Sequence, residues 1–154
     1  MKLNLGCSDR TLPPPWINVD ICPPADMIAD LSQGWPWADS SVSEVAAFDV
    51  FEHLPDKKHT LEELYRVLKP SGKATIEVPC AAHGAGAFQD CGHVSYWTGN
   101  DFEYVEKGNY ARERFRNNPL YPNADFRIES ATHTKYQGKF DEVFKFRITL
   151  VAIK

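Results

Sequence analysis

Two short apolar runs near the N-terminus each stop at a residue suited to ligand binding. Leu3 and Leu5 are followed at once by Gly6, and the run 16–19 is followed by Asp20. Glycine lets a backbone turn sharply and approach a ligand, because it has no side chain and tolerates positive φ. Ligands of open α/β sheets bind outside the carboxyl ends of the strands. The pattern therefore predicts two parallel strands whose ends share a crevice.

A carboxylate at the end of the second run suits a ribose. Asp20 would accept hydrogen bonds from two hydroxyl groups, and its charge would strengthen both. A third short run, 27–29, again ends on an acid, Asp30. Acids also follow strands for structural reasons alone, so these residues by themselves leave a nucleoside site and a purely structural role open.

The segment between the first two runs holds three successive prolines, Pro13 to Pro15. Proline cannot occupy the interior of a helix, since it lacks a backbone N–H and clashes with the preceding turn. An extended loop is therefore expected where a βαβ unit has its crossover helix. The prolines disfavour a nicotinamide-dependent dehydrogenase, whose pyrophosphate needs a helix N-terminus.

The middle of the chain predicts one clear helix between two strands. Val45 to Phe48 indicates a buried strand, and the alternation over 73–78 indicates another that ends at Pro79. Between them, leucines at helical spacing follow Thr60 and Glu63, which form the pattern of a capping box. The C-terminal runs 126–129 and 143–153 predict an antiparallel hairpin.

Composition limits the class of protein. A chain of 154 residues is the length of one domain, 1–154. Its net charge of -4 gives no general attraction to nucleic acid or to an anionic membrane, and neither is expected as a partner. No signal peptide or membrane span is predicted. Four cysteines without paired spacing fit reduced thiols in a cytoplasmic protein.

Several stretches in order resemble one family. LNLGCS, INVDI, IADL, VFEHLPD, LEELYRVLKPSG and IEVP, within residues 2–100, look like the class I S-adenosylmethionine-dependent methyltransferases, especially the small type-11-like bacterial and phage group. The resemblance implies a Rossmann-like α/β sheet of order 3-2-1-4-5-7-6, mostly parallel with a C-terminal antiparallel hairpin. Two departures stand out: Ser8 and Asp9 replace the second glycine region, and the N-terminal cap helices are missing.

The resemblance also implies cofactor contacts. The residues that match the family's contacts to the methionine part, the ribose, the adenine and the sulfonium of S-adenosylmethionine are Asn4, Gly6 and Cys7, then Asp20, then Ile21, Asp30 and Leu31, and finally Phe48 and Asp49. No dinucleotide is expected.

Two histidines are candidate catalytic residues, because a general base helps when the methyl acceptor is a hydroxyl. His53 follows the fourth strand, and His93 lies in DCGHVSYWT, where similar proteins carry a D-x-x-H segment followed by aromatic residues. Each histidine could instead have a structural role, His53 in starting a helix and His93 in holding its loop.

No metal ligands are predicted, although two sets of residues offer candidate ligand atoms. Asp49-x-x-Glu52-His53 is similar to the E-x-x-E-H tract by which ubiquinone-pathway and small-RNA O-methyltransferases hold a divalent ion, but Glu-His is widespread here in relatives not known to bind metal. A zinc site of His83, Cys91 and His93 matches no tight ligand spacing.

The function expected from these features is methyl transfer from S-adenosylmethionine to a small-molecule or sugar-like acceptor. The alternative is a non-catalytic cofactor-binding or scaffold protein that keeps the fold. The changed glycine motif favours this alternative, whereas Asp20, Asp30 and His53 favour the enzyme. A homodimer is left open, because a partner subunit could shield the acceptor site in place of the missing cap.

Overall fold

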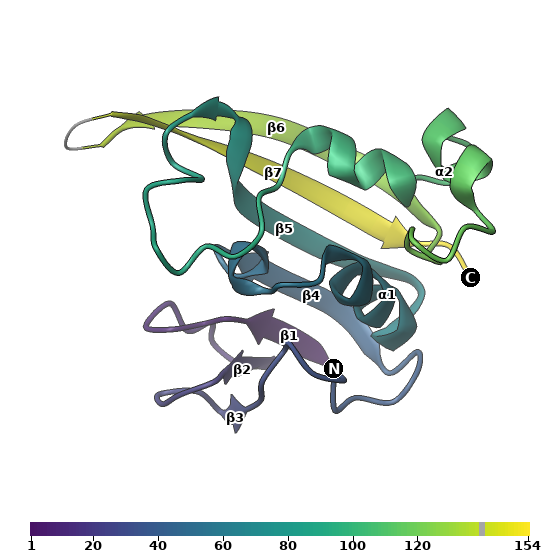
Figure 1. Ribbon diagram of the computed structural model, residues 1–154. Helices are drawn as coiled ribbons and strands as arrows, with labels where there is room; N and C mark the ends of the chain where they lie inside the picture. Colours follow the sequence, from purple (N-terminus) through teal and green to yellow (C-terminus); the bar gives the residue numbers. More distant parts are fainter. Residues whose placement is uncertain (139–140) are drawn as a thin grey trace.

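The computed structural model describes residues 1–138 and 141–154, which form one seven-stranded sheet. The strand order is β3-β2-β1-β4-β5-β7-β6, as the family resemblance implies. Strands β1 to β5 run parallel, and β7 pairs antiparallel with both β5 and β6 (Figure 1). The strands in chain order are β1 Lys2–Leu5, β2 Trp16–Asp20, β3 Met27–Ile28, β4 Val42–Phe48, β5 Leu68–Gly84, β6 Phe126–Gln137 and β7 Glu142–Ala152.

Few helices accompany this sheet. The described elements are the 3-10 helices η1 (Phe51–His53) and η2 (Gly99–Tyr104) and the α-helices α1 (Lys57–Val67) and α2 (Tyr110–Phe115). Both α-helices and η2 lie on one side of the sheet in Figure 1. No helix in the described part of the chain is long and apolar enough to cross a membrane.

The helix-covered face of the sheet holds the hydrophobic core. Leu5, Ala47, Ile76 and Ile148 occupy neighbouring positions on adjacent strands and are at most 1% exposed. The amphipathic helix α1 adds Leu61, Leu64 and Val67 to the same core. Apolar residues alternate along the strands because only one face of the sheet is packed.

The opposite face of the sheet carries polar side chains in place of packed helices. On this face Lys2 pairs with Glu44, Thr75 lies beside Thr149, and Arg147 pairs with Glu77. Over β1 and β2, the proline loop 9–15 covers a network in which Asn4 donates to Asn18. The loop thus replaces the crossover helix, as its prolines predict.

Helix α1 begins earlier than the capping-box pattern predicts, and that prediction is wrong. Asp56 is the N-cap, and its side chain accepts a hydrogen bond from the backbone N–H of His59. Thr60 instead donates to the carbonyl of Asp56, and Glu63 accepts from the backbone N–H of Trp35. The helix begins one turn earlier, at Lys57, so the carboxylate of Asp56 caps it and Thr60 lies within the helix.

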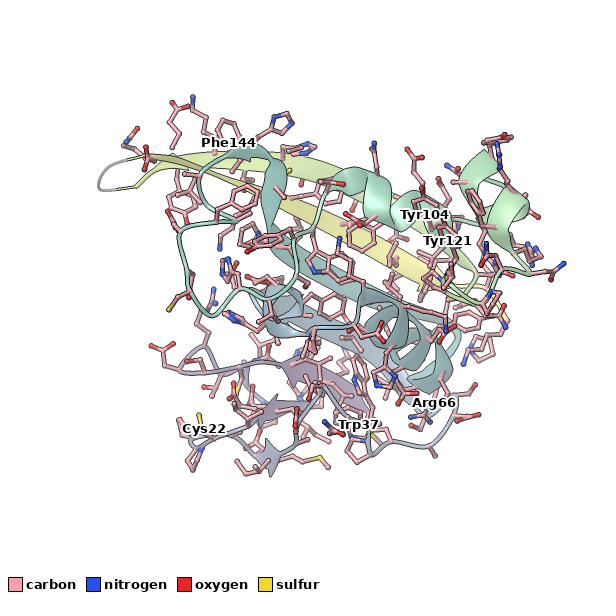
Figure 2. All side chains as sticks on the ribbon, viewed as in Figure 1. Cys22, Trp37, Arg66, Tyr104, Tyr121 and Phe144 are labelled. Atoms are coloured by element: carbon pink, nitrogen blue, oxygen red, sulfur yellow. The ribbon has the colours of Figure 1, made fainter. Side chains whose placement is uncertain are left out.

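Two other expectations differ from the structure. Pro79 does not end the fifth strand, because it pairs with Lys145 of β7 and the strand continues to Gly84. The C-terminal hairpin is longer than expected, with β6 reaching Gln137. Trp35 and Trp37 are buried in the core, and Arg66 of α1 donates to the carbonyl of Trp37 (Figure 2).

The four cysteines, Cys7, Cys22, Cys80 and Cys91, are free, as expected for reduced thiols.

Near α2, the rings of Tyr104 and Tyr121 stack with centroids 5.0 Å apart (Figure 2). They close the core beside α2, away from the strand ends that carry the predicted site.

Candidate functional site

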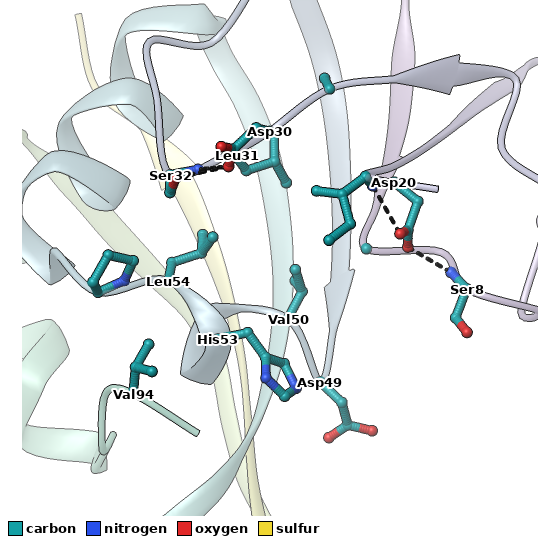
Figure 3. A pocket seen from close by; sticks show the side chains of 14 residues that line it. Ser8, Asp20, Asp30, Leu31, Ser32, Asp49, Val50, His53, Leu54 and Val94 are labelled. Atoms are coloured by element: carbon teal, nitrogen blue, oxygen red, sulfur yellow. Dashed lines mark hydrogen bonds between the residues drawn. The ribbon is translucent and has the colours of Figure 1, made fainter. Parts of the chain in front are cut away.

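A cavity of about 520 Å³ opens at the carboxyl ends of the parallel strands. We call it the donor cavity, and its volume lies within the usual range for small-molecule sites. Figure 3 shows Asp20, Asp30 and His53 around it, from three different segments. Its lining residues are Gly6, Ser8, Asp20, Ile21, Ala29, Asp30, Leu31, Ser32, Asp49, Val50, His53, Leu54, Pro55 and Val94.

Gly6 sets the floor of the donor cavity. Its φ of +59° lies in the left-handed region, and an added Cβ would lie 2.4 Å from Cγ2 of Val50. Only glycine fits both constraints, since other residues rarely adopt this φ and no side chain has room. The chain therefore turns tightly after β1 and leaves open the space above Val50.

Asp20 is held in place by the backbone around it. One carboxylate oxygen accepts from the N–H of Ser8 at 2.9 Å, and the other accepts from the N–H of Ile21 at 2.8 Å (Figure 3). The first bond comes from the loop after β1, so Asp20 ties the ends of β1 and β2 together. The carboxylate is oriented before any ligand binds.

Asp30 has a similar arrangement at the next strand end. Its Oδ1 accepts from the hydroxyl of Ser32 at 2.7 Å and from the N–H of Ser32 at 2.9 Å. These two bonds lower the pKa of Asp30, so the carboxylate stays charged at neutral pH.

Asp49 follows β4 in a strained backbone conformation, with φ at +55°. Its Oδ2 accepts from Nζ of Lys145 at 2.5 Å and from the Arg10 guanidinium at 3.2 Å. Its other oxygen, Oδ1, is buried without a hydrogen-bond partner among the described residues. The carboxylate of Asp49, which would be a metal ligand in the E-x-x-E-H pattern, is therefore already paired with two cationic side chains.

A second, smaller cavity of about 210 Å³ shares Asp49 and His53 with the donor cavity. We call it the loop cavity, because the loop 85–98 supplies Gly86, Gln89, Asp90 and His93 to its wall. Glu52, Pro79, Tyr136, Val143 and Lys145 complete the lining.

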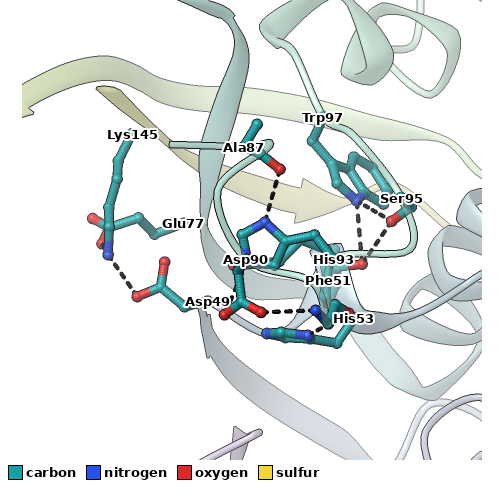
Figure 4. Close-up of polar contacts among 12 residues, drawn as sticks. Asp49, Phe51, His53, Glu77, Ala87, Asp90, His93, Ser95, Trp97 and Lys145 are labelled. Carbon is teal, nitrogen blue, oxygen red and sulfur yellow. Dashed lines mark hydrogen bonds and ion pairs between the residues drawn. The ribbon is translucent and has the colours of Figure 1, made fainter. Parts of the chain in front are cut away.

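Hydrogen bonds attach this loop to η1. The carbonyl of Glu52 accepts from the N–H groups of Val94 and Ser95 at 2.9 and 3.0 Å. The carbonyl of Phe51 accepts from the hydroxyl of Ser95 and from Nε1 of Trp97, at 3.0 and 3.2 Å (Figure 4). The loop is thus fixed against the segment that carries His53.

Both site histidines have a defined tautomer. Nδ1 of His53 lies 2.9 Å from the carbonyl of Gly92, and Nδ1 of His93 lies 2.8 Å from the carbonyl of Ala87. A carbonyl can only accept, so each Nδ1 carries the hydrogen and donates. In the neutral imidazole the Nε2 atom then has a free lone pair, ready to accept a proton or bind a metal.

Glu52 is the least satisfied group in this region. The residue is 2% exposed, and both carboxylate oxygens are buried without hydrogen-bond partners among the described residues. Burial raises the pKa of Glu52 to about 8, and the charge of Asp49 adds to the rise. Oε1 lies 4.0 Å from Nε2 of His93, too far for a hydrogen bond.

The structure brings together most of the residues predicted from sequence. Gly6, Asp20, Ile21, Asp30, Leu31, Asp49 and His53 line the donor cavity, and His93 lines the adjoining loop cavity. Asn4, Cys7 and Phe48 line neither cavity. Asn4 and Cys7 are buried, and the Phe48 ring lies under the Arg147 guanidinium on the polar face of the sheet.

Sequence reasoning missed several lining residues. Val50, Leu54 and Val94 give the donor cavity its apolar wall, and Lys145 reaches Asp49 from β7. The apolar residues after β4 offered a signal, because VFEHLP lies directly beside Asp49. Val94 directly follows the predicted His93, whereas Lys145 comes from the distant strand β7 and gave no signal.

The strand order, the antiparallel β5–β7–β6 end and the cavity at the parallel strand ends define the class I methyltransferase fold. Residues 17–76 match the family model described as a methyltransferase domain. No curated protein matches the chain in sequence. The match and the fold confirm the resemblance to class I S-adenosylmethionine-dependent methyltransferases.

Solved structures share this fold over nearly the whole chain. A SAM-dependent methyltransferase from Methanosarcina mazei is 13% identical with a TM-score of 0.64, and the match covers 99% of this chain and 92% of that one. A putative methyltransferase from Bacillus halodurans is 12% identical with a TM-score of 0.67 and the same coverage. A putative methyltransferase from Haloferax volcanii, solved with the Trm112 methyltransferase activator, is 16% identical with a TM-score of 0.63, covering 99% and 82%.

Proposed function

We propose that the protein transfers a methyl group from S-adenosylmethionine to a small-molecule or sugar-like acceptor. The observation that carries the proposal is the donor cavity, in which two oriented carboxylates, Asp20 and Asp30, stand at neighbouring strand ends beside the Gly6 turn. S-adenosylmethionine supplies an electrophilic methyl group on its sulfonium. The residues described below would bind it, orient it and exclude water.

Each part of the donor cavity suits one part of this cofactor. Asp20 would accept hydrogen bonds from the ribose hydroxyls, and Asp30 would meet the polar edge of the adenine, with Leu31 and Ile21 beside the ring. Gly6 leaves room for the methionine part at the Asp49 end. Displacement at a sulfonium methyl group needs alignment and a dry site, which the apolar wall at Val50 and Leu54 provides.

The acceptor would lie in the loop cavity, since this cavity meets the donor cavity at Asp49 and His53. For a hydroxyl acceptor, the free Nε2 of His53 or His93 would take the proton as the oxygen–carbon bond forms and the carbon–sulfur bond breaks. The Nδ1 hydrogen bonds to Gly92 and Ala87 fix the tautomer in which the Nε2 lone pair of the neutral imidazole is free.

A second role for the same two imidazoles follows from Glu52. One donor atom each from Glu52, His53 and His93 lie within 4.8 Å of one another. A divalent cation between them would satisfy the two unpaired oxygens of Glu52, and the nitrogen-rich set suits a transition metal better than magnesium. A bound cation would polarise the acceptor oxygen. The ligand set would differ from the E-x-x-E-H pattern, with His93 in place of Asp49.

The first experiment tests cofactor binding by calorimetric titration with S-adenosylmethionine and with its demethylated product. Binding of both is expected. Asp20→Ala should weaken binding about a hundredfold, because two charge-assisted hydrogen bonds at roughly 1.5 kcal/mol each are lost. Asp9→Ala is the matched control, since Asp9 is exposed and lines neither cavity.

Two outcomes would count against the proposal. No binding of either ligand at millimolar concentration would rule out both the enzyme and the non-catalytic cofactor-binding protein. Equal affinity of Asp20→Ala and the wild type would place the ribose elsewhere. Binding without turnover of any hydroxyl, amine or sugar acceptor in a screen would favour the scaffold alternative.

The second experiment separates the base from the metal ligand. Calorimetric titration with Mn²⁺ should show one site in the wild type, and Glu52→Gln should weaken it at least about tenfold while S-adenosylmethionine affinity stays unchanged. Glu106→Gln is the control, because Glu106 lies outside both cavities. If Mn²⁺ does not bind the wild type, the histidines act without a metal.

A further inference from the structure

Three side chains of types that can bind metals meet beside strands β5 and β6, outside the lining of both cavities. Cys80 and His83 come from β5 and His133 comes from β6. One donor atom of each residue lies within 4.8 Å of the others, although β7 separates the two strands. None of the three lines the donor cavity or the loop cavity.

An irregularity in β5 brings the first two residues together. Pro79 pairs with Lys145 and Gly84 pairs with Val143, so residues 80–83 of β5 face only one residue of β7. Bulges of this kind redirect side chains and are often found beside functional sites. Because of these extra residues, the side chain of His83 lies close to that of Cys80. In a regular strand, residues three positions apart would point to opposite faces.

Glycine makes this bulge a fixed feature of the chain. Gly84 has a φ of +68°, and an added Cβ would lie 2.7 Å from the carbonyl oxygen of Glu142. Gly86 has a similar restriction, because an added Cβ would lie 2.7 Å from Cγ1 of Val143. The bulge therefore depends on glycine at the position where the strand resumes pairing.

Two phenylalanines of β7 form the floor beneath the histidines. The ring centroid of His83 lies 5.8 Å from that of Phe144, and the centroid of His133 lies 4.9 Å from that of Phe146 (Figure 2 labels Phe144). The two imidazoles meet nearly edge to face, with centroids 5.6 Å apart and planes at 79°. This aromatic packing explains the positions of the two imidazole rings. It does not involve the thiol of Cys80.

The thiol of Cys80 points into the same cluster. The residue is 0% exposed, and among the described residues no hydrogen bond involves its Sγ. His83 and His133 are exposed, so the cluster has a buried sulfur on one side and solvent on the other. Three protein ligands with one position open to solvent is a common arrangement for zinc.

We propose that Cys80, His83 and His133 bind a zinc-like divalent cation. Tetrahedral coordination places the donor atoms about 3.3–3.8 Å apart, so small side-chain rotations would complete the site. On binding, the Sγ–H bond breaks, the proton passes to water and a metal–sulfur bond forms. Water takes the fourth position. The cation joins the β5 bulge to β6 across β7.

This site differs in chemistry from the Glu52 cluster and does not depend on the proposed methyl transfer. A thiolate favours zinc and cobalt over manganese and magnesium, whereas the carboxylate and imidazoles of the Glu52 cluster accept manganese. The two sites can therefore be measured separately in one protein.

Titration of the reduced full-length chain with Co²⁺ tests the proposal, because a thiolate ligand gives cobalt a charge-transfer band in the near ultraviolet. One Co²⁺ per chain with this band is expected, and Zn²⁺ should displace it. Cys80→Ser should abolish the band, and His83→Ala and His133→Ala should each weaken binding at least about tenfold. Cys22→Ser, which removes an exposed cysteine elsewhere, should leave the band unchanged.

Since Cys80 is buried, the two histidine variants keep the test decisive if Cys80→Ser fails to fold. Both histidines are exposed, so their replacement should preserve the circular dichroism spectrum. The proposal is wrong if the wild type shows no thiolate band, or if the double variant His83→Ala and His133→Ala keeps the band with the wild-type affinity. Loss of the band in Cys22→Ser would also overturn it.

Discussion

The two cavities that meet at Asp49 and His53 are built in different ways. The donor cavity lies at strand ends, and its acids already have partners: Asp20 accepts from three backbone N–H groups and Asp30 from Ser32. The loop cavity forms where the loop 85–98 lies on η1, and the carboxylate oxygens of Glu52 there have no partner among the described residues.

The two cavities therefore differ in what a ligand would add to each. A buried polar group without a partner costs about 1–3 kcal/mol, whereas a hydrogen-bonded carboxylate at a cavity mouth is already oriented. The donor cavity is therefore preorganised for its ligand. The loop cavity would gain stability from a ligand that satisfies Glu52, which is the physical reason for proposing a cation there.

The largest expected effect comes from breaking the donor cavity at Gly6. Gly6→Ala would place a Cβ 2.4 Å from Cγ2 of Val50, at a φ of +59°. Overpacking and the unfavourable φ should together destabilise the protein by about 2–4 kcal/mol. Because Val50 lines the cavity, S-adenosylmethionine affinity should fall at least about tenfold. Urea unfolding and calorimetry measure the two effects.

Gly34→Ala is the matched control, because an added Cβ at Gly34 meets nothing within 4 Å. It should change neither stability nor affinity by more than about 0.5 kcal/mol. If Gly6→Ala binds S-adenosylmethionine as tightly as the wild type, the methionine part of the ligand does not lie above this turn.

Much of the donor cavity could be predicted because its residues follow strands directly in the sequence. Gly6, Asp20 and Asp30 each come one or two positions after an apolar run, and parallel strand ends meet at one edge of a sheet. The proline loop was equally predictable, since Pro13 to Pro15 exclude a helix whatever the surrounding fold.

The loop cavity could be predicted only in part, because its geometry depends on contacts between distant segments. His93 lies in a stretch without periodicity, and only the bonds from Val94 and Ser95 to Glu52 fix its place. The burial of Glu52 follows from the same contacts. The polar face of the sheet was also unexpected, since strands such as β5 alternate in a way that fits either a covered or an open second face.

A smaller effect is expected from the pH dependence of stability, measured with a chelator present. The pKa of Glu52 is raised from 4.5 to about 8 in the folded protein, so the native state holds a proton there that the unfolded state has lost. The stability linked to this group is full below pH 4.5 and is lost as the pH rises through about 8. Glu52→Gln should therefore be more stable than the wild type at pH 8–9, by about 1–3 kcal/mol.

Denaturant unfolding of both proteins between pH 5 and 9 measures this difference. Asp49, Asp90, Lys145 and the two histidines also face Glu52, but they are present in both proteins and largely cancel in the comparison. Parallel pH profiles for the wild type and Glu52→Gln would show that Glu52 is ionised normally. The unpaired oxygens would then have water as their partner.

The smallest effect concerns the attachment of the loop to η1. Ser95→Ala removes a hydrogen bond to the carbonyl of Phe51 and one from Nε1 of Trp97, but Trp97 keeps its own bond to Phe51. No donor is left unpaired, so the expected loss of stability is only about 0.5–1.5 kcal/mol. Ser43→Ala, which removes a surface bond to Met1, is the control.

Ser95→Ala is most informative when its affinities for Mn²⁺ and for S-adenosylmethionine are compared, because each ligand reports on one cavity. A looser loop should displace His93 and weaken Mn²⁺ binding a few-fold, while S-adenosylmethionine affinity stays unchanged because strand ends hold Asp20 and Asp30. Equal weakening of both ligands would mean that the loop also shapes the donor cavity, through Val94. The two cavities would then act as one unit, and acceptor binding would order the donor site as well.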